Sequence, residues 1–402
     1  MSRIDQLIAE LCPNGVEYKR LKEVCSDFIV PMRDRPKVFD GNIPWCRIED
    51  IEGQYFHKSL SGLAVSDKVI AEMNLKVIPT GSVICSCSAS LGVYAINSQP
   101  LITNQTFIAL VCGKDILNKY LRYVMETQTK KLIAASNSGT IPYISRKKFE
   151  ELVIAVPPLP IQEEIVRILD AFTELEAELE AELEARKKQY EHYRKRLLTC
   201  FNKEVLLKLS EIASFRRGSF PQPYGESRWY GGEQAMPFVQ VADVNDEGLR
   251  LAEKTKQQIS KLAQPKSVFV PTGTVVVTLQ GTIGRVAITQ YDSFVDRTLA
   301  IFQTFKINID KRYFAYQLRE KFNLEKENAR GSTLKTITKE EFSNFEIPVV
   351  TLQEQIKIVE TLDKLEELTA DINSGLPAEI EARRKQYEYY RDKLLTFKEI
   401  KD

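Results

Sequence analysis

Two kinds of hydrophobic pattern alternate along the chain. The first mixes short apolar runs, which predict buried β-strands, with segments of helical spacing. It occupies residues 1–157 and 202–350. The predicted strands are Val83–Cys85, Thr106–Val111, Val275–Leu279 and Leu299–Phe302, and a predicted helix covers Lys114–Ala135. Both blocks are therefore expected to be mixed α/β domains of an α+β protein.

Polar residues mark the starts of two short helices in these blocks. Thr338 precedes Glu341 by three positions, which predicts a capping box. Ser145 occupies the matching place in the first block. The run Pro157–Pro160 predicts the end of that block.

The second pattern is purely helical. Residues 161–199 contain neither Gly nor Pro, and Leu175, Leu179 and Leu183 recur at every fourth position. The matching segment 351–402 is interrupted at Asn373–Pro377, where Gly predicts a helix end and Pro a new start. The apolar stripes of both helices must be buried, which favours pairing of the two helices with each other. Packing of each helix on its own domain is the alternative.

The patterns recur because the chain is a tandem duplication. Glu184–Thr199 returns as Glu381–Thr396 with 12 of 16 positions identical, at an offset of 197. Weaker matches at offsets of 192 and 193 link the two blocks, among them Ile43–Ile51 with Met236–Val244. The sequence thus predicts four parts: a domain at 1–157, a helical spacer at 158–201, a second domain at 202–350 and a second spacer at 351–402.

Composition and charge narrow the class of protein. The chain of 402 residues is 43% apolar and 28% charged, which excludes a disordered or fibrous protein. Its formal net charge is +1, but the globular blocks carry +3 and +4 and each helical part −3. A neutral chain is therefore compatible with two local anion-binding surfaces.

Basic residues gather with aromatic ones in one loop of each block, and such loops can approach a phosphate backbone and place a guanidinium on a base edge. Further polar loop residues extend each candidate surface; an ordinary surface role is the alternative for every one of them. In the first block the candidates are Arg33, Arg35, Lys37, Arg47, Asn104, Gln105, Asn137 and Thr140. In the second they are Arg216, Arg217, Arg228, Trp229, Tyr230, Gln280, Arg285, Arg297, Arg330 and Lys335.

Signals of catalysis, metals and membranes are missing from the sequence. It has no phosphate-binding loop, no Gly-rich cofactor fingerprint and no Ser/His/Asp pattern. Seven scattered Cys and two His indicate free thiols in a reducing cytoplasm rather than a metal site. No apolar stretch is long enough to span a membrane. We therefore expect a cytoplasmic, non-catalytic protein without a cofactor of its own.

The chain resembles the specificity subunits of Type I restriction-modification systems over essentially its whole length. The resemblance rests on Pro157–Asp170 and Gly375–Arg391, which are similar to the family's two helical regions. It also rests on Gly41–Trp45 and Thr103–Gln105 in the first domain. The second copy has Asp296-Arg297 where the first has Asn104-Gln105.

The resemblance implies two target-recognition domains with pseudo-two-fold symmetry, each recognising half of a bipartite double-stranded DNA sequence. The two long helices would form an antiparallel coiled coil and set the spacing between the half-sites. Two methyltransferase subunits, which use S-adenosylmethionine, and two restriction subunits, which use ATP and Mg, would join the complex. A duplicated protein-binding scaffold, or a specificity subunit with a fused methyltransferase-nuclease partner, are the alternatives. Tyrosines are typical interface anchors, and the candidates for partner docking are Tyr190, Tyr193, Tyr387 and Tyr390.

Overall fold

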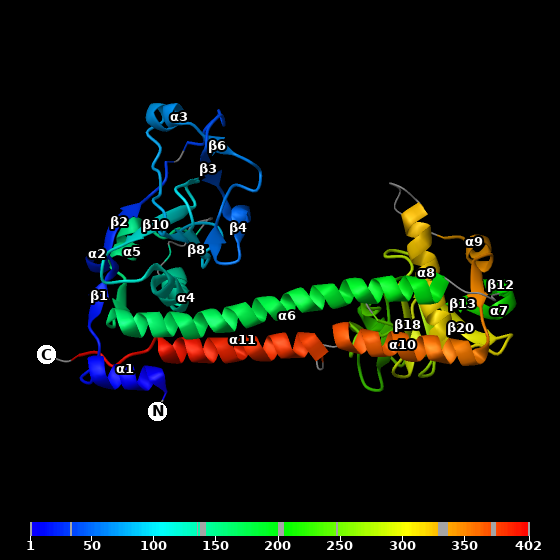
Figure 1. Cartoon of the computed structure of the whole chain (residues 1–402). Helices are drawn as coiled ribbons and strands as arrows, with labels where there is room; N and C mark the ends of the chain where they lie inside the picture. The colour runs from blue at the N-terminus through cyan, green and yellow to red at the C-terminus, as the bar shows by residue number, and fades with distance from the viewer. Residues whose placement is uncertain are drawn as a thin grey trace. The chain divides into compact units, whose positions relative to one another are not determined.

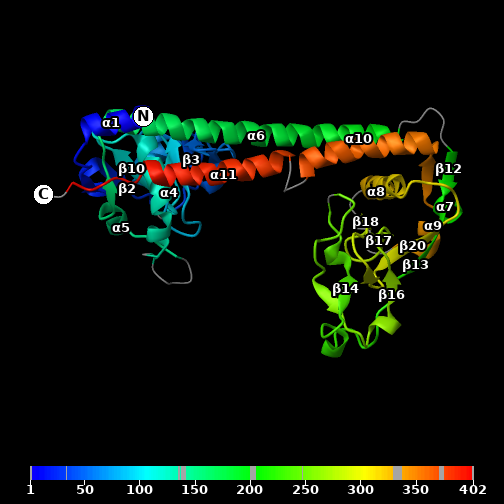
Figure 2. The same cartoon turned by 90° about the horizontal axis from the view of Figure 1, so that it is seen from below.

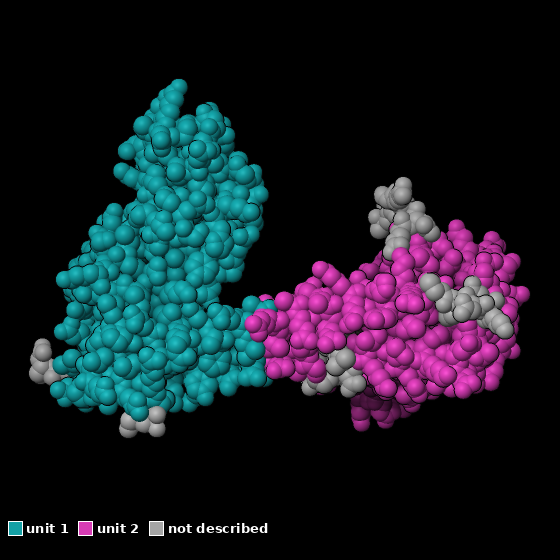
Figure 3. All heavy atoms as spheres, viewed as in Figure 1, with its two compact units in different colours: residues 1–177, 382–402 teal, residues 178–381 magenta. Residues whose placement is uncertain are grey.

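The protein folds into two compact units, coloured separately in Figure 3. The computed structural model describes residues 2–32, 34–134, 136, 142–199, 205–246, 248–328, 337–370 and 375–400. Unit 1 comprises residues 1–177 and 382–402, and unit 2 comprises residues 178–381. Each unit therefore combines one globular block with a piece of both helical regions.

Unit 1 contains the first globular block (Figure 1). Its helices are α1 (Arg3–Leu11), α2 (Leu21–Val24), α3 (Asp67–Glu72), α4 (Asn118–Ala134) and α5 (Arg146–Glu150). Its strands are β1 (Tyr18–Arg20), β2 (Cys25–Ile29), β3 (Ile43–Cys46), β4 (Ile51–Glu52), β5 (Tyr55–Phe56), β6 (Ala64–Val65), β7 (Val83–Ser86), β8 (Tyr94–Asn97), β9 (Ile102–Thr103), β10 (Phe107–Cys112) and β11 (Val153–Ala155). The main sheet has the order β2-β10-β7-β8-β5-β4, and a smaller sheet has the order β6-β3-β9.

Unit 2 contains the second globular block. Its helices are α7 (Leu209–Ile212), α8 (Lys311–Asn328), α9 (Lys339–Ser343) and α10 (Leu352–Ala370). Its strands are β12 (Val205–Lys208), β13 (Ala213–Arg217), β14 (Met236–Val239), β15 (Gln257–Ile259), β16 (Val268–Val270), β17 (Val275–Thr278), β18 (Val286–Ile288), β19 (Ser293–Val295), β20 (Leu299–Phe305) and β21 (Glu346–Val349). The sheets have the orders β13-β20-β17-β18 and β15-β14-β19-β16.

The strand orders confirm the tandem duplication. β2-β10-β7-β8 of unit 1 corresponds to β13-β20-β17-β18 of unit 2, and β6-β3-β9 corresponds to β15-β14-β19. In both units the pairing of the first and last strands of the block, β1 with β11 and β12 with β21, is antiparallel. The four strands predicted from apolar runs are β7, β10, β17 and β20.

The predicted helix at Lys114–Ala135 is α4, which begins later, at Asn118. Buried Gln162 explains this later start of α4, because its side chain holds the loop before the helix. Its Oε1 accepts a hydrogen bond from the Leu117 N–H at 2.9 Å, and its Nε2 donates to the Asp115 carbonyl at 2.9 Å. Gln355 repeats the first of these bonds in unit 2, with the Asp310 N–H at 2.8 Å. The predicted capping box at Thr338 is present at the start of α9.

A repeated glycine allows the long helix of each block to approach its sheet. Gly92 and Gly284 both have positive φ, +92° and +82°. A Cβ on Gly284 would lie 2.6 Å from Phe322 Cβ in α8, and one on Gly92 would lie 2.8 Å from Thr129 Cγ2 in α4. Only glycine fits both the backbone conformation and the space, which explains its recurrence at an offset of 192.

The helical regions differ in continuity as predicted. The first is one helix, α6 (Leu159–Thr199), and the second consists of α10 and α11 (Gly375–Leu394), with Gly375 at φ +69°. In unit 1, α6 and α11 pack antiparallel (Figure 2). Arg384 pairs with Glu176 at 2.5 Å, and Tyr390 stacks on Phe172 with centroids 5.5 Å apart. Residue numbers rise along one helix as they fall along the other, which is the expected coiled-coil direction.

Candidate nucleic-acid interface

Unit 1 gathers several of the predicted residues around one surface pocket of about 270 Å³. Arg35, Arg47, Asn104 and Gln105 line it together with Met32, Asp34 and Trp45. The Arg35 guanidinium lies 5.2 Å from the ring centroid of Trp45 and 5.7 Å from that of Phe39. Two loops far apart in the sequence thus form one basic and polar surface. Lys37 is exposed on the same loop as Arg35.

A parallel strand pair brings these loops together. β3 pairs with β9, with Trp45 opposite Ile102 and Cys46 opposite Thr103. The Asn104 N–H extends the pairing to the Cys46 carbonyl at 3.3 Å. Because the two strands are parallel, Arg47 and Gln105 both follow the carboxyl ends of neighbouring strands.

A buried carboxylate and a carboxamide fix the backbone of this corner. Asp50 is 1% exposed, and its two oxygens accept the Arg47 and Leu60 N–H groups, both at 2.7 Å. On the neighbouring strand end, Asn104 Oδ1 accepts the Thr106 hydroxyl at 2.6 Å. Asn104 therefore holds the turn through its Oδ1, and the side chains at positions 47 and 105 start from a rigid base.

Unit 2 builds the same corner with other side chains. β14 pairs in parallel with β19, Phe238 opposite Phe294 and Val239 opposite Val295. The buried carboxylate is Asp243, which accepts the Gln240 N–H at 2.8 Å, and the turn residue is Asp296, which accepts the Thr298 hydroxyl at 2.6 Å. Gln240 and Arg297 therefore occupy the places of Arg47 and Gln105.

Tyr224 lies over this second corner. Gln240 Nε2 donates to the Tyr224 hydroxyl at 2.8 Å, and the Arg297 guanidinium lies 5.5 Å from the Tyr224 ring centroid. The ring is 45% exposed. Burial raises the pKa of the neighbouring Tyr230 to about 12, so both phenols stay neutral hydrogen-bonding groups at physiological pH.

The predicted Arg-aromatic loop of unit 2 is more buried than its composition indicates. Trp229 is 3% exposed, and its Nε1 donates to the Pro223 carbonyl at 3.1 Å. The Arg228 guanidinium and the Lys266 ammonium lie 4.2 Å and 5.2 Å from its ring centroid. The indole thus anchors the loop and holds two cations near the surface, while Tyr224 is the exposed ring.

The remaining candidates of unit 2 are held within the domain, lie on segments next to this corner, or fall outside the described residues. Arg285 is held within the domain, by an ion pair with Asp246 and a hydrogen bond to the Val244 carbonyl at 3.3 Å. Arg216 and Arg217 are exposed on β13, and Gln280 is half-buried after β17. Of the candidates in both blocks, Arg33, Asn137, Thr140, Arg330 and Lys335 lie outside the described residues.

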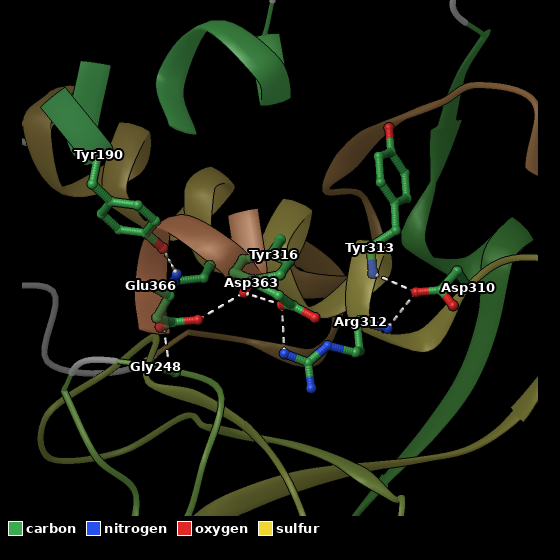
Figure 4. Close-up of polar contacts among 9 residues, drawn as sticks. Tyr190, Gly248, Asp310, Arg312, Tyr313, Tyr316, Asp363 and Glu366 are labelled. Carbon is green, nitrogen blue, oxygen red and sulfur yellow. Dashed lines mark hydrogen bonds and ion pairs between the residues drawn. The ribbon is translucent and has the colours of Figure 1, made fainter. Parts of the chain in front are cut away.

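Two of the four candidate docking tyrosines make hydrogen bonds to a globular block. Tyr190 of α6 accepts a hydrogen bond from Arg319 Nη2 of α8 at 3.1 Å (Figure 4). Tyr387 of α11 donates to Glu126 Oε2 of α4 at 2.8 Å. Burial raises the pKa of both phenols. Each tyrosine therefore attaches its long helix to a globular block, and in both cases it is the block of the other sequence repeat.

A polar cluster continues this attachment in unit 2. The Tyr316 hydroxyl lies 2.8 Å from Asp363 Oδ1 and 2.7 Å from Glu366 Oε2, both on α10 (Figure 4). Arg312 pairs with Asp363 at 2.5 Å. In unit 1, the Tyr123 hydroxyl donates to Asp170 at 2.7 Å. The repeat of Tyr and Asp at matching positions shows that the same attachment is used twice.

The other two docking candidates are accessible. Tyr193 is 40% exposed on α6 and Tyr390 is 36% exposed on α11, beside Tyr389 at 63%. Sequence reasoning missed Tyr389, although it directly precedes a candidate. It also missed Gln240 and the buried aspartates Asp50 and Asp243, whose place after a strand is the only local signal.

The described residues contain no group of three or more His, Cys, Asp or Glu side chains arranged to hold a metal ion. The cysteines in the described part of the chain are unbonded, and burial raises the pKa of Cys25 and Cys46 to about 12. No helix within the described ranges is long and apolar enough to cross a membrane.

Comparison with known families matches two copies of one domain. Residues 13–185 and 204–382 match the Type I restriction modification DNA specificity domain. The specificity subunit of a Type I restriction enzyme of Escherichia coli is 33% identical over 294 residues, which cover 70% of this chain and 71% of that protein. A putative specificity subunit of Haemophilus influenzae is 28% identical and covers 95% of this chain and 96% of its own length.

Solved structures have the same fold. A chain from a study of complex assembly and conformational transition of the Type I restriction-modification system has a TM-score of 0.64 at 20% identity, covering 96% of this chain and 98% of that one. A specificity subunit from Thermoanaerobacter tengcongensis has a TM-score of 0.51 at 20% identity, covering 96% and 97%.

Proposed function

Because the chain belongs to the family of Type I restriction-modification DNA specificity proteins, we propose that it is the DNA-recognition subunit of such a complex. Each globular block recognises one half of a bipartite double-stranded DNA target. The single observation that carries the proposal is the duplicated corner, in which an arginine and a glutamine, one exposed and the other partly exposed, follow two rigid strand ends of each unit. Phosphate contacts by neighbouring basic residues, such as Arg35 and Arg228, would position each block on the duplex.

The helical regions connect the blocks and dock partner subunits. Tyr190 and Tyr387 attach the helices to the blocks, which leaves Tyr193, Tyr389 and Tyr390 as exposed anchors for methyltransferase subunits. Exposed tyrosines are enriched at protein interfaces because they bury a large ring while keeping a polar end. The helices would also set the distance between the two half-sites.

The chain itself contributes recognition rather than chemistry. Two methyltransferase subunits would supply S-adenosylmethionine-dependent adenine methylation, and two restriction subunits would supply ATP- and Mg-dependent translocation and cleavage. Support comes from the absence of known catalytic motifs in the sequence and from the names of the relatives, which are specificity subunits.

The test is an exchange of one block in the complete complex. Residues 1–157 are replaced by the matching block of a relative, the system is expressed in a host, and the methylated motif is determined by sequencing the methylome. We expect one half of the motif to change and the other to remain. Exchange of residues 202–350 is the matched control and should change the opposite half.

Binding of the purified complex to labelled duplexes separates this function from a protein scaffold. A recognition subunit should give affinity that falls steeply with salt, because phosphate contacts release counterions. A folded, assembled complex without a methylation motif and without salt-dependent DNA binding would refute the proposal and favour a scaffold.

A further inference from the structure

The two units carry the same pair of side-chain types at matching positions, but in exchanged order. After β3 and β14 the first residue is Arg47 in unit 1 and Gln240 in unit 2. Two residues after β9 and β19 stand Gln105 and Arg297. The strand registers establish this equivalence independently of sequence alignment, because Cys46 pairs with Thr103 as Val239 pairs with Val295.

The hydrogen bonds around the corner repeat as well. The Asn104 N–H donates to the Cys46 carbonyl at 3.3 Å, and the Asp296 N–H donates to the Val239 carbonyl at 3.0 Å. Buried Asp50 and Asp243 each accept the backbone N–H of the variable residue, at 2.7 Å and 2.8 Å. The frame is therefore constant while the projecting side chains differ, which is the arrangement expected where one scaffold recognises two different sequences.

Arginine and glutamine have different preferences among base edges. The guanidinium donates two parallel hydrogen bonds to guanine O6 and N7, whereas the carboxamide accepts from adenine N6 and donates to adenine N7. Both side chains of each pair are accessible: Gln105 and Arg297 are exposed, and Arg47 and Gln240 are partly exposed.

The nearby groups leave hydrogen-bonding capacity unused at the corner. Arg47 Nη2 pairs with Glu49 at 2.9 Å, and its Nε is a buried atom with no hydrogen-bond partner among the described residues. A base would therefore be contacted by the terminal amino groups of the guanidinium. Gln240 Nε2 uses one of its two hydrogens on the Tyr224 hydroxyl, so the second hydrogen and Oε1 remain for a base. Tyr224 is then a positioning residue that orients the amide of Gln240.

We propose that Arg47 with Gln105, and Gln240 with Arg297, are the base-recognition pairs of the two units. Each half-site contains a guanine and an adenine contacted by its pair, in opposite order relative to the common fold. The inference rests on the proposed function and deepens it, since it names residues that determine specificity.

The test exchanges the pair within one unit without changing its charge. Arg47→Gln combined with Gln105→Arg gives unit 1 the order found in unit 2, and the reverse change is Gln240→Arg combined with Arg297→Gln. Because net charge is preserved, general attraction to phosphates is unchanged. Lys147→Gln, at an exposed lysine of α5, is the control for loss of a charge elsewhere in unit 1.

Each variant is expressed with its methyltransferase subunits, and the methylome is sequenced. We expect the unit 1 exchange to swap guanine and adenine at two positions of one half-site and leave the other half-site intact. In fluorescence anisotropy, wild type should prefer the parent duplex, and the variant the swapped duplex, by about 5- to 150-fold for each of the two contacts. The Lys147→Gln complex should keep the wild-type motif.

Duplexes with 7-deazapurines test the same contact on the unaltered protein, so the result does not depend on folding of a variant. Removing the N7 acceptor of the contacted guanine or adenine should weaken wild-type binding, and Arg47→Ala should abolish the penalty at the guanine. A wild-type complex without any bipartite motif would refute the proposed function itself. A wild-type motif that both exchange variants retain, a uniform loss of affinity on all duplexes, or no effect of any 7-deazapurine would overturn the pairing alone.

Discussion

Removal of one hydroxyl from the polar cluster of unit 2 should lower the stability of that unit. Tyr316→Phe deletes the group that lies 2.8 Å from Asp363 and 2.7 Å from Glu366. The Asp363 side chain is 36% exposed and can be rehydrated, whereas that of Glu366 is only 16% exposed. A hydrogen bond to a charged group contributes about 1.5–3 kcal/mol. Because one of the two carboxylates stays partly hydrated, we expect a loss of about 2 kcal/mol.

Thermal unfolding and hydrogen exchange measure this effect. For a unit of this size, about 2 kcal/mol corresponds to a decrease in Tm of roughly 4–8 °C. Amide protection should fall in α8 and α10 and remain in the sheet of unit 1. Tyr123→Phe, the matching change at the Asp170 contact, should act on unit 1 instead. Tyr389→Phe, at a ring that is 63% exposed, is the control. A Tyr316→Phe effect no larger than that of the control would refute our account of the cluster.

Three other contacts and elements can be tested in the same way. Inserting one more Glu-Leu-Glu-Ala unit after Glu174–Ala185 lengthens α6 by about 6 Å and rotates the C-terminal part of the helix by about 40°. Because DNA rises about 3.4 Å per base pair, methylome sequencing should find both half-sites kept and the spacer one base pair longer. An unchanged spacer with full activity would show that the helix does not set the spacing. Gly284→Ala should lower the free energy of unfolding of unit 2 in urea by more than Gly273→Ala does. Both glycines have φ near +80°, but only at Gly284 would a Cβ lie 2.6 Å from Phe322; equal losses of stability for the two variants would contradict the steric explanation. Burial raises the pKa of Tyr316 above its ordinary value, so the stability that its neutral hydroxyl contributes is complete below the unfolded pKa of about 10 and is lost as pH rises. Between pH 9 and 11, the free energy of unfolding should fall further in wild type than in Tyr316→Phe, by an amount on the order of the hydroxyl's contribution; parallel pH profiles would contradict this.

Local signals in the sequence predicted most of the elements. The strands β7, β10, β17 and β20, the capping box at Thr338 and the unbroken helix α6 depend on periodicity and on side chains within a few residues. The duplication was also evident without a structure, because 12 of 16 identical positions recur at one offset. The matching strand orders of the two units are its structural counterpart.

Long-range pairing set the limits of prediction at the candidate interface. Arg35, Arg47, Asn104 and Gln105 were each named from residue type and loop chemistry, yet nothing local indicates that they share a pocket. Their meeting depends on the parallel pairing of β3 (Ile43–Cys46) with β9 (Ile102–Thr103), which are far apart in the sequence. Trp229 shows the opposite case: its loop composition indicates an exposed ring, but tertiary packing buries it.

Periodicity, composition and repetition along the chain are enough to predict two related domains, two helical regions and a break in the second of them. Which helix segment packs on which block follows from the folded structure. Tyr190 follows the first block but contacts Arg319 of the second, and Tyr387 follows the second but contacts Glu126 of the first. It also decided that Gln240 and Arg297 stand where Arg47 and Gln105 stand. The physical reason is that side-chain burial and strand register depend on contacts between distant residues, and these form only when the whole unit has folded.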